Sequence, residues 1–240
     1  MSRRADTTAI IAAARKQYEA ILKDYDRALQ DHRLDLRIPV KNLMENLRSA
    51  LDYMAHDIYD GCCKSFRAAT GKSDPRNIYF PYGRTDQDFR AGLGSSLPDL
   101  QTQNLGVYQL VESIQPFRSK DSWLYDLCSI LNENKHDKLT AQVLSENETY
   151  TVKSEFGSVS IPVNNPNIQV TSMPGAVQIF GVPAQFTSEG IKTAPSDRLT
   201  HRREKWVAFT FEGSNVNVIG MLDKAVAGIS DFANRLYRLI

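Results

Sequence analysis

Residues 131–140, LNENKHDKLT, gather side chains that could carry proton and phosphate chemistry at the end of an amphipathic segment. On a helix, Asn132 and His136 are four residues apart and project from the same face, while Lys135 lies one step around. A histidine can exchange a proton near neutral pH, and a neighbouring lysine cation can neutralise a phosphate. In this interpretation, the segment forms half of a site that handles phosphoryl groups.

A purely structural interpretation explains the same residues. A cation in the last turn of a helix is stabilised by the helix dipole, by about 0.3–1 kcal/mol at an exposed position. Lys135 and His136 would then only complement the dipole, and Asn134 would end the helix. The segment alone leaves both interpretations open.

A second polar row lies earlier in the chain. Arg48, Asp52 and His56 step by four along one predicted helix, directly beside its apolar edge. Charge at the border of a core is costly unless it is paired, and Arg48 with Asp52 can form an ion pair worth about 0.2–0.5 kcal/mol. If the two helices pack antiparallel, this row meets the end of the helix that carries His136.

Helices must position both rows. Apolar residues recur at helical spacing in five segments, and one long stretch between them is rich in Gly, Pro, Ser and Asp. The stretch predicts a long loop over residues 71–103. The periodic segments predict helices over residues 9–29, 40–69, 104–114, 121–135 and 218–240.

Residues between 140 and 217 have a different texture. Short β-branched or aromatic runs alternate there with Gly, Pro, Asn and Ser, which is typical of antiparallel strands. We therefore predict an α+β fold: an N-terminal helical bundle, an antiparallel β-region and a closing C-terminal helix. The bundle covers residues 1–139, and residues 140–240 hold the β-region and the last helix, packed with the bundle as one unit.

Composition narrows the classes of partner. The 240 residues include 29 Lys and Arg against 28 Asp and Glu, so a nucleic-acid site would have to be local. No apolar run approaches the roughly 18 residues of a membrane helix, and the N-terminus does not resemble a signal peptide. The three cysteines indicate reduced thiols, and none has a partner at zinc spacing. We expect a cytoplasmic protein without a metal, a cofactor or membrane contact.

Four segments carry a family resemblance: NLRSALDYMAHDIY at 46–59, FP at 80–81, QPF at 115–117 and LCSILNENKHDKL at 127–139. Their order and spacing resemble a group of bacterial and phage proteins to which no activity is assigned. Those proteins read LRSALDHL, FPI, QPY and DKHR at the corresponding places. The resemblance covers about residues 42–139 and extends to the β-region followed by a closing helix.

A wider resemblance is to HEPN-type helical domains. These are bundles of four or five helices that commonly dimerise, and many are metal-independent ribonucleases with a histidine four to six residues after an arginine. The resemblance implies a homodimer formed through the bundle, with RNA as partner. Here Tyr53 stands at the histidine position after Arg48, and the DKHR element reads Asn134-Lys135-His136-Asp137. His136 is therefore the candidate catalytic histidine, because it follows a lysine as in the DKHR element.

The first functional hypothesis is therefore a HEPN-like ribonuclease or RNA-binding module. RNA cleavage without a metal needs a base for the ribose 2′-OH, an acid for the leaving oxygen and cations over the phosphorane. His136 would be the base or acid, and Arg48 and Lys135 the cations. Asn132 or Asp52 would orient the imidazole. This hypothesis requires His136 to be exposed in a cleft beside Arg48 or Lys135.

Two other classes of function remain. A non-catalytic dimerisation or interaction protein would bury the same polar row as a network that is satisfied internally. A small-ligand binder would use residues 78–97 as a lid over an apolar cavity between the bundle and the sheet.

Overall fold

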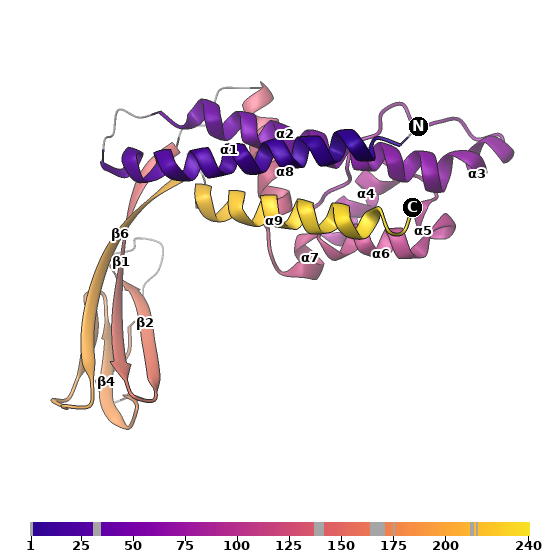
Figure 1. The fold of residues 1–240 in the computed structure, drawn as a ribbon. Helices are drawn as coiled ribbons and strands as arrows, with labels where there is room; N and C mark the ends of the chain where they lie inside the picture. Colours follow the sequence, from indigo (N-terminus) through magenta and orange to yellow (C-terminus); the bar gives the residue numbers. More distant parts are fainter. Residues whose placement is uncertain are drawn as a thin grey trace. The chain divides into compact units, whose positions relative to one another are not determined.

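The computed structural model describes residues 2–30, 35–136, 142–163, 171–174, 176–211, 214 and 216–240. The chain forms two compact units, Met1–Gln142 with Phe211–Ile240, and Val143–Thr210. Helices precede and follow a β-region, as Figure 1 shows, so the predicted α+β class is confirmed.

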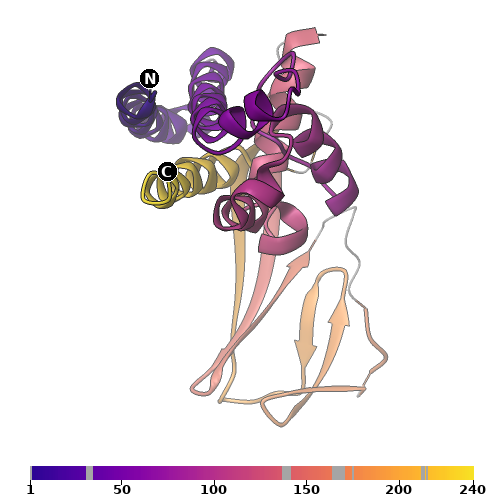
Figure 2. The same cartoon turned by 90° about the vertical axis from the view of Figure 1, so that its right-hand side faces the viewer.

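Three long helices form the frame of the first unit: α1 (Arg4–Gln30), α2 (Arg37–Ile58) and α9 (Val218–Leu236). They lie side by side, with both chain ends at the same end of the group, and Figure 2 shows them nearly along their axes. Every helix turns an apolar stripe inward, and fully burying one such side chain stabilises the fold by about 1.5–3 kcal/mol. Phe80 and Phe232 meet edge to face in this core, with ring centroids 5.2 Å apart.

The second predicted helix contains a break in its hydrogen-bond pattern. After α2, a π-helical turn, η1 (Tyr59–Cys63), leads into α3 (Lys64–Ala69). The Tyr59 hydroxyl lies 2.6 Å from the Asp74 carboxylate and ties this turn to the segment that follows α3. The predicted run over residues 40–69 is therefore helical throughout, but it is not one regular α-helix.

The predicted loop over residues 71–103 is wrong in its second part, which holds α4 (Asp86–Ser96) and α5 (Leu100–Gln103). The Thr85 side chain accepts a hydrogen bond from the Asp88 backbone N–H, and the Asp88 carboxylate accepts one from the Thr85 N–H. This capping box starts α4. Gly92 and Gly94 lie inside the helix and each lower its propensity by about 1 kcal/mol, which obscured it in the sequence.

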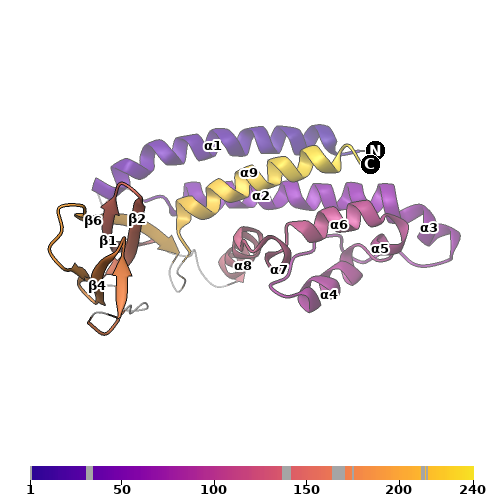
Figure 3. The same ribbon diagram turned by 90° about the horizontal axis from the view of Figure 1, so that it is seen from below.

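The remaining helices complete the first unit. They are α6 (Leu105–Ser113), α7 (Pro116–Ser119) and α8 (Trp123–His136). Their positions confirm the helices predicted over residues 104–114 and 121–135. These helices lie on the side of α2 and α9 that faces away from α1 (Figure 3), and α8 packs against both α2 and α9.

The described residues of the second unit form two three-stranded sheets. One has the order β2-β1-β6, from β1 (Gln142–Ser154), β2 (Gly157–Val163) and β6 (Thr200–Phe211); the other has the order β3-β4-β5, from β3 (Val177–Ile179), β4 (Val182–Thr187) and β5 (Gly190–Thr193). In the first sheet β1 and β2 are antiparallel, with Val152 opposite Val159. In the second, β4 is antiparallel to both neighbours. Side chains of both sheets share one core, which includes Val152, Ile161, Ile179 and Ile191.

Both chain ends are tied to α2 through one buried carboxylate. Asp57 accepts hydrogen bonds from the Ser2 hydroxyl at 3.2 Å, the Arg3 backbone N–H at 2.9 Å and the Tyr237 hydroxyl at 2.9 Å. Its side chain is only 3% exposed, and Arg3 Nη1 lies 3.3 Å from Oδ1. Burial raises the pKa of Tyr237 to about 12, so its hydroxyl stays a neutral donor.

We expect Asp57→Asn to lower the free energy of unfolding by about 2 kcal/mol, because an amide accepts at only one oxygen and carries no charge for Arg3. For a chain of this size, the melting temperature should fall by about 4–8 °C. Asp60→Asn is the matched control: Asp60 also pairs with Arg3 but is 32% exposed, so the change should cost less than about 1 kcal/mol. Equal melting shifts in the two variants would contradict this account of Asp57.

Candidate functional site

A pocket of about 410 Å³ opens among α2, α8 and the segment that leads into α4. Three of the five predicted site residues, Arg48, Asp52 and Asn132, line it. The opposite wall comes from the stretch 71–103 that the sequence predicted to be a loop. It consists of Tyr79, Phe80, Pro81, Tyr82, Gly92 and Ser96. One member of the first polar row, Asn132, and two of the second, Arg48 and Asp52, therefore line the same pocket of the helical unit.

Arg48 is held on three sides. Its Nη1 donates to the Cys128 sulfur at 2.7 Å, its Nε donates to the Asp52 carboxylate at 3.3 Å, and its guanidinium lies 5.2 Å from the centroid of the Tyr82 ring. The side chain is 14% exposed. Burial acts to lower the pKa of Arg48, but Cys128 and Asp52 outweigh it, and the net pKa is raised. The pocket therefore contains a permanent, oriented cation.

Asp52 joins α2 to the wall of the pocket. One carboxylate oxygen accepts the hydrogen bond from Arg48, and the other accepts the Phe80 backbone N–H at 2.8 Å. Both oxygens thus have a protein partner, although the side chain is 23% exposed. Its geometry is that of a residue that fixes Arg48 and the chain at Phe80.

Asn132 approaches from α8 and contacts the same wall. Its Nδ2 donates to the Tyr82 hydroxyl at 2.6 Å, and the Tyr82 ring lies 6.2 Å from that of Tyr125. Burial raises the pKa of Tyr82, so the hydroxyl remains neutral at ordinary pH. Tyr82 is therefore held by Asn132 at its hydroxyl and by Arg48 at its face.

A buried glutamine supports this wall from behind. Gln115 is 0% exposed, and its Nε2 donates to the carbonyls of Pro81 at 3.2 Å and Val111 at 3.1 Å. Its Oε1 accepts the Gly83 N–H at 3.2 Å. A Cβ on Gly83 would lie 2.3 Å from the Phe89 backbone nitrogen, so only glycine fits there. Gln115 therefore bonds to the residues on both sides of Tyr82, Pro81 and Gly83, and fixes the backbone that carries it.

The four segments with the family resemblance meet around this pocket or its support. Arg48 and Asp52 of segment 46–59 and Asn132 of α8 line the pocket. Phe80 and Pro81 lie opposite, and Gln115 of the QPF segment donates to the Pro81 carbonyl. Their convergence singled out residues that sequence reasoning had left without a role: Tyr82, Gln115 and Cys128.

The two remaining predicted residues are placed only by their backbone. The helix α8 extends to His136, and His136 follows Asn132 by four residues on the same helical face. The side chains of Lys135 and His136 lie outside the described part of the structure. His56, the third member of the polar row on α2, is half-buried and does not line the pocket.

The described residues offer neither a metal site nor a membrane-spanning helix. Among them, no three His, Cys, Asp or Glu side chains are grouped so that they could hold a metal ion. No helix within the described ranges is long and apolar enough to cross a membrane. Burial raises the pKa of the Cys62 thiol, and that of Cys63 to about 12, so these thiols are protonated at neutral pH.

No family model, curated protein or solved structure matches the chain at a significant level. Function must therefore be inferred from the chemistry of the pocket.

Proposed function

We propose that the pocket binds single-stranded RNA and that the protein cleaves it without a metal ion, as a HEPN-like ribonuclease. The observation that supports this most is the convergence of Arg48, Asp52 and Asn132 on one pocket, beside the helix that carries His136. A cation, hydrogen-bonding groups and a proton-exchanging side chain are what transfer to the ribose 2′-oxygen requires.

The reaction breaks one P–O bond and forms another. His136 takes the proton of the 2′-OH, the 2′-oxygen attacks the phosphorus, and the 5′-oxygen leaves with a proton from a water molecule. The products are a 2′,3′-cyclic phosphate and a free 5′-hydroxyl. Arg48 and Lys135 neutralise the charge that develops on the phosphorane.

The contacts divide the supporting roles. Because both oxygens of Asp52 are engaged, we assign it to positioning Arg48 rather than to orienting the imidazole. Asn132, on the same helical face as His136, takes the orienting role. Tyr79 lines the pocket and is 54% exposed, so its ring offers a platform on which a base can stack, worth about 1–3 kcal/mol.

The direct test is cleavage of a 5′-labelled, twenty-nucleotide RNA in the presence of EDTA. The proposal expects products that end in a 2′,3′-cyclic phosphate, and no cleavage of the DNA oligomer of the same sequence, because it lacks the attacking 2′-OH. Products with a 3′-hydroxyl, or cleavage that stops in EDTA, would contradict it. If RNA binds but is not cleaved, the protein is an RNA-binding module and the catalytic part of the proposal is wrong.

The proposal includes a homodimer formed through the helical bundle, which would bring two sets of site residues into one particle. Sedimentation equilibrium at the assay concentration tests this part separately. A monomer with full cleavage activity would show that one set is sufficient.

A non-catalytic interaction module is the second candidate, and one observation favours it. The polar groups of the pocket already bond to protein partners, Arg48 to Cys128 and Asp52 to the Phe80 N–H. Such a network can serve to fix the helices in register. Absence of both RNA cleavage and RNA binding would favour this function.

Small-ligand binding is the third candidate, and the size of the pocket supports it. The pocket lies within the helical unit, whereas the sequence-based hypothesis placed the cavity between the bundle and the sheet. Its volume falls within the roughly 300–1,000 Å³ of ligand sites, and residues of the 78–97 segment form one wall. The walls combine a cation and a carboxylate with aromatic rings, so the ligand would be polar rather than purely apolar.

A further inference from the structure

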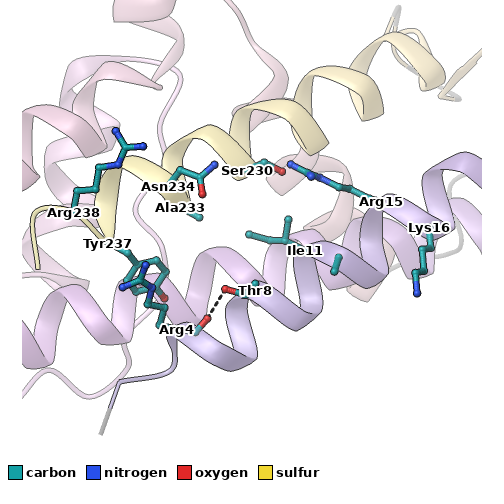
Figure 4. Close-up of a pocket in the computed structure, with 11 residues that line it drawn as sticks. Arg4, Thr8, Ile11, Arg15, Lys16, Ser230, Ala233, Asn234, Tyr237 and Arg238 are labelled. Atoms are coloured by element: carbon teal, nitrogen blue, oxygen red, sulfur yellow. Dashed lines mark hydrogen bonds between the residues drawn. The ribbon is translucent and has the colours of Figure 1, made fainter.

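A second groove, of about 650 Å³, runs between α1 and α9 (Figure 4). It shares no lining residue with the pocket described above. Four of its lining residues are exposed cations, Arg4, Arg15 and Lys16 on α1 and Arg238 just after α9. Asn234 adds an exposed amide to the wall formed by α9.

Cations predominate in the lining of this groove, while Asp57 and Asp60 line a neighbouring pocket that also includes Arg4 and Tyr237. Its lining contains no Asp or Glu, and none of the four cations forms an ion pair with a carboxylate of the described residues. Other cations of the same unit are paired, such as Arg67 with Asp99 and Arg90 with Asp86. In a chain whose formal net charge is +1, these four form a local positive surface of the kind that a polyanion recognises.

The distance between the cations matches the length of several consecutive phosphates in a nucleic-acid strand. Arg4 and Arg15 are eleven residues apart, three helical turns along one face, which is roughly 16 Å along the axis of α1. Figure 4 shows Arg15 at one end of the groove and Arg4 with Tyr237 at the other, where the guanidinium lies 5.4 Å from the ring centroid. A stacked strand carries one phosphate per about 3.4 Å, so the groove spans on the order of four or five phosphates.

Other anionic partners fit less well. A helix that binds a lipid surface presents a broad exposed apolar face, whereas no large exposed apolar side chain lines this groove and Ile11 is only 9% exposed. A single phosphate group on a peptide is held by arginines gathered around one point. The cations here lie instead at the two ends of the groove, with Arg15 and Lys16 at one end and Arg4 at the other.

We infer that the groove between α1 and α9 binds the phosphodiester backbone of a single-stranded nucleic acid through Arg4, Arg15, Lys16 and Arg238. The contacts are with phosphates, so binding depends steeply on salt and little on base sequence. This function does not require the pocket to be catalytic.

Binding of fluorescein-labelled dT20 to the full chain, followed by anisotropy between 50 and 200 mM NaCl, tests the inference. This oligomer has no 2′-OH and is not a substrate for the proposed cleavage, so the two proposals can fail independently. Each lost phosphate contact reduces the slope of log K against log salt by about 0.7. The double variant Arg15→Ala/Arg238→Ala should therefore lose about 1.4 in slope and bind roughly 10–100-fold more weakly at 50 mM NaCl.

The matched control is Lys23→Ala/Arg235→Ala, which removes two exposed cations from the same two helices outside the groove. Arg235 is paired with Asp231, and this variant should bind dT20 within about twofold of the wild type. The single change Lys16→Ala should lose about 0.7 in slope and confirms the result at one exposed position.

Three outcomes would overturn the inference. The wild type fails to bind dT20, or both double variants weaken binding equally. In the third, the Arg15→Ala/Arg238→Ala variant loses binding to vesicles of phosphatidylserine and phosphatidylcholine but keeps its affinity for dT20. The last result would assign the groove to a lipid headgroup instead.

Discussion

His136→Ala is expected to lower the rate of metal-independent RNA cleavage by about 10²–10⁴-fold, the usual contribution of one general acid or base. The reason is the position of the residue: it follows Asn132 by one helical turn on α8, and Asn132 lines the same pocket as Arg48 and Asp52. Alanine keeps the helix, since it has the highest helix propensity, and removes only the imidazole. The measurement is the single-turnover rate on labelled RNA in EDTA.

The effect must belong to catalysis rather than to folding or binding. His56→Ala is the matched control, because it removes an imidazole from the same helical unit without touching the lining of the pocket. We expect its rate to stay within about twofold of the wild type, a factor worth only about 0.4 kcal/mol. The affinity of His136→Ala for RNA should also be unchanged, because phosphate contacts elsewhere supply most of the binding. An unaltered rate for His136→Ala would remove this residue from the mechanism.

The helices could be read from the sequence because their signal is local. Apolar spacing predicted α1, α6, α8 and α9 close to their observed positions. It missed α4, because Gly92 and Gly94 made that stretch look like a loop, whereas the pattern Thr85…Asp88 already held the capping box that starts the helix. A capping pattern deserves weight even where the following residues are poor helix formers.

In the candidate site too, contacts within one helix were predicted from the sequence, whereas contacts between residues far apart in the sequence were not. The sequence predicted the ion pair of Arg48 with Asp52 because residues four apart lie on the same face in consecutive turns of a helix. The contacts that hold these residues in place could not be predicted. Arg48 bonds to Cys128, which is 80 residues away in the sequence, and Asn132 bonds to Tyr82, which is 50 residues away. No periodicity connects such positions, so their roles follow only from the packing of separate elements.

Gln115→Ala is expected to lower the free energy of unfolding by about 3 kcal/mol, the largest stability effect that we predict. The change removes the side-chain partner of the Gly83 N–H and of the Pro81 and Val111 carbonyls in a buried place, and a buried group left unsatisfied costs about 1–3 kcal/mol. The melting temperature should fall by about 6–12 °C. Gln103→Ala, at an exposed position, should change stability by less than about 0.5 kcal/mol.

The local consequence distinguishes this prediction from general destabilisation. Gln115 holds the backbone on both sides of Tyr82, so its loss should release the segment that carries Tyr82 and the exposed Arg84. We expect trypsin to cleave after Arg84 faster in the variant at temperatures well below its melting point, and RNA cleavage to fall with it.

Gln115→Glu distinguishes the hydrogen bond that Gln115 accepts from Gly83 from those that it donates to Pro81 and Val111. A glutamate at this position still accepts from the Gly83 N–H, but it has no N–H to offer Pro81 and Val111 and would bury a charge beside two carbonyl oxygens. It should therefore destabilise the protein at least as much as alanine does. If glutamate instead restored wild-type stability and protection of Arg84 at a pH where it is ionised and has no proton to donate, the bond to Gly83 alone would hold the wall of the pocket. The two carbonyl contacts would then contribute little to positioning Tyr82.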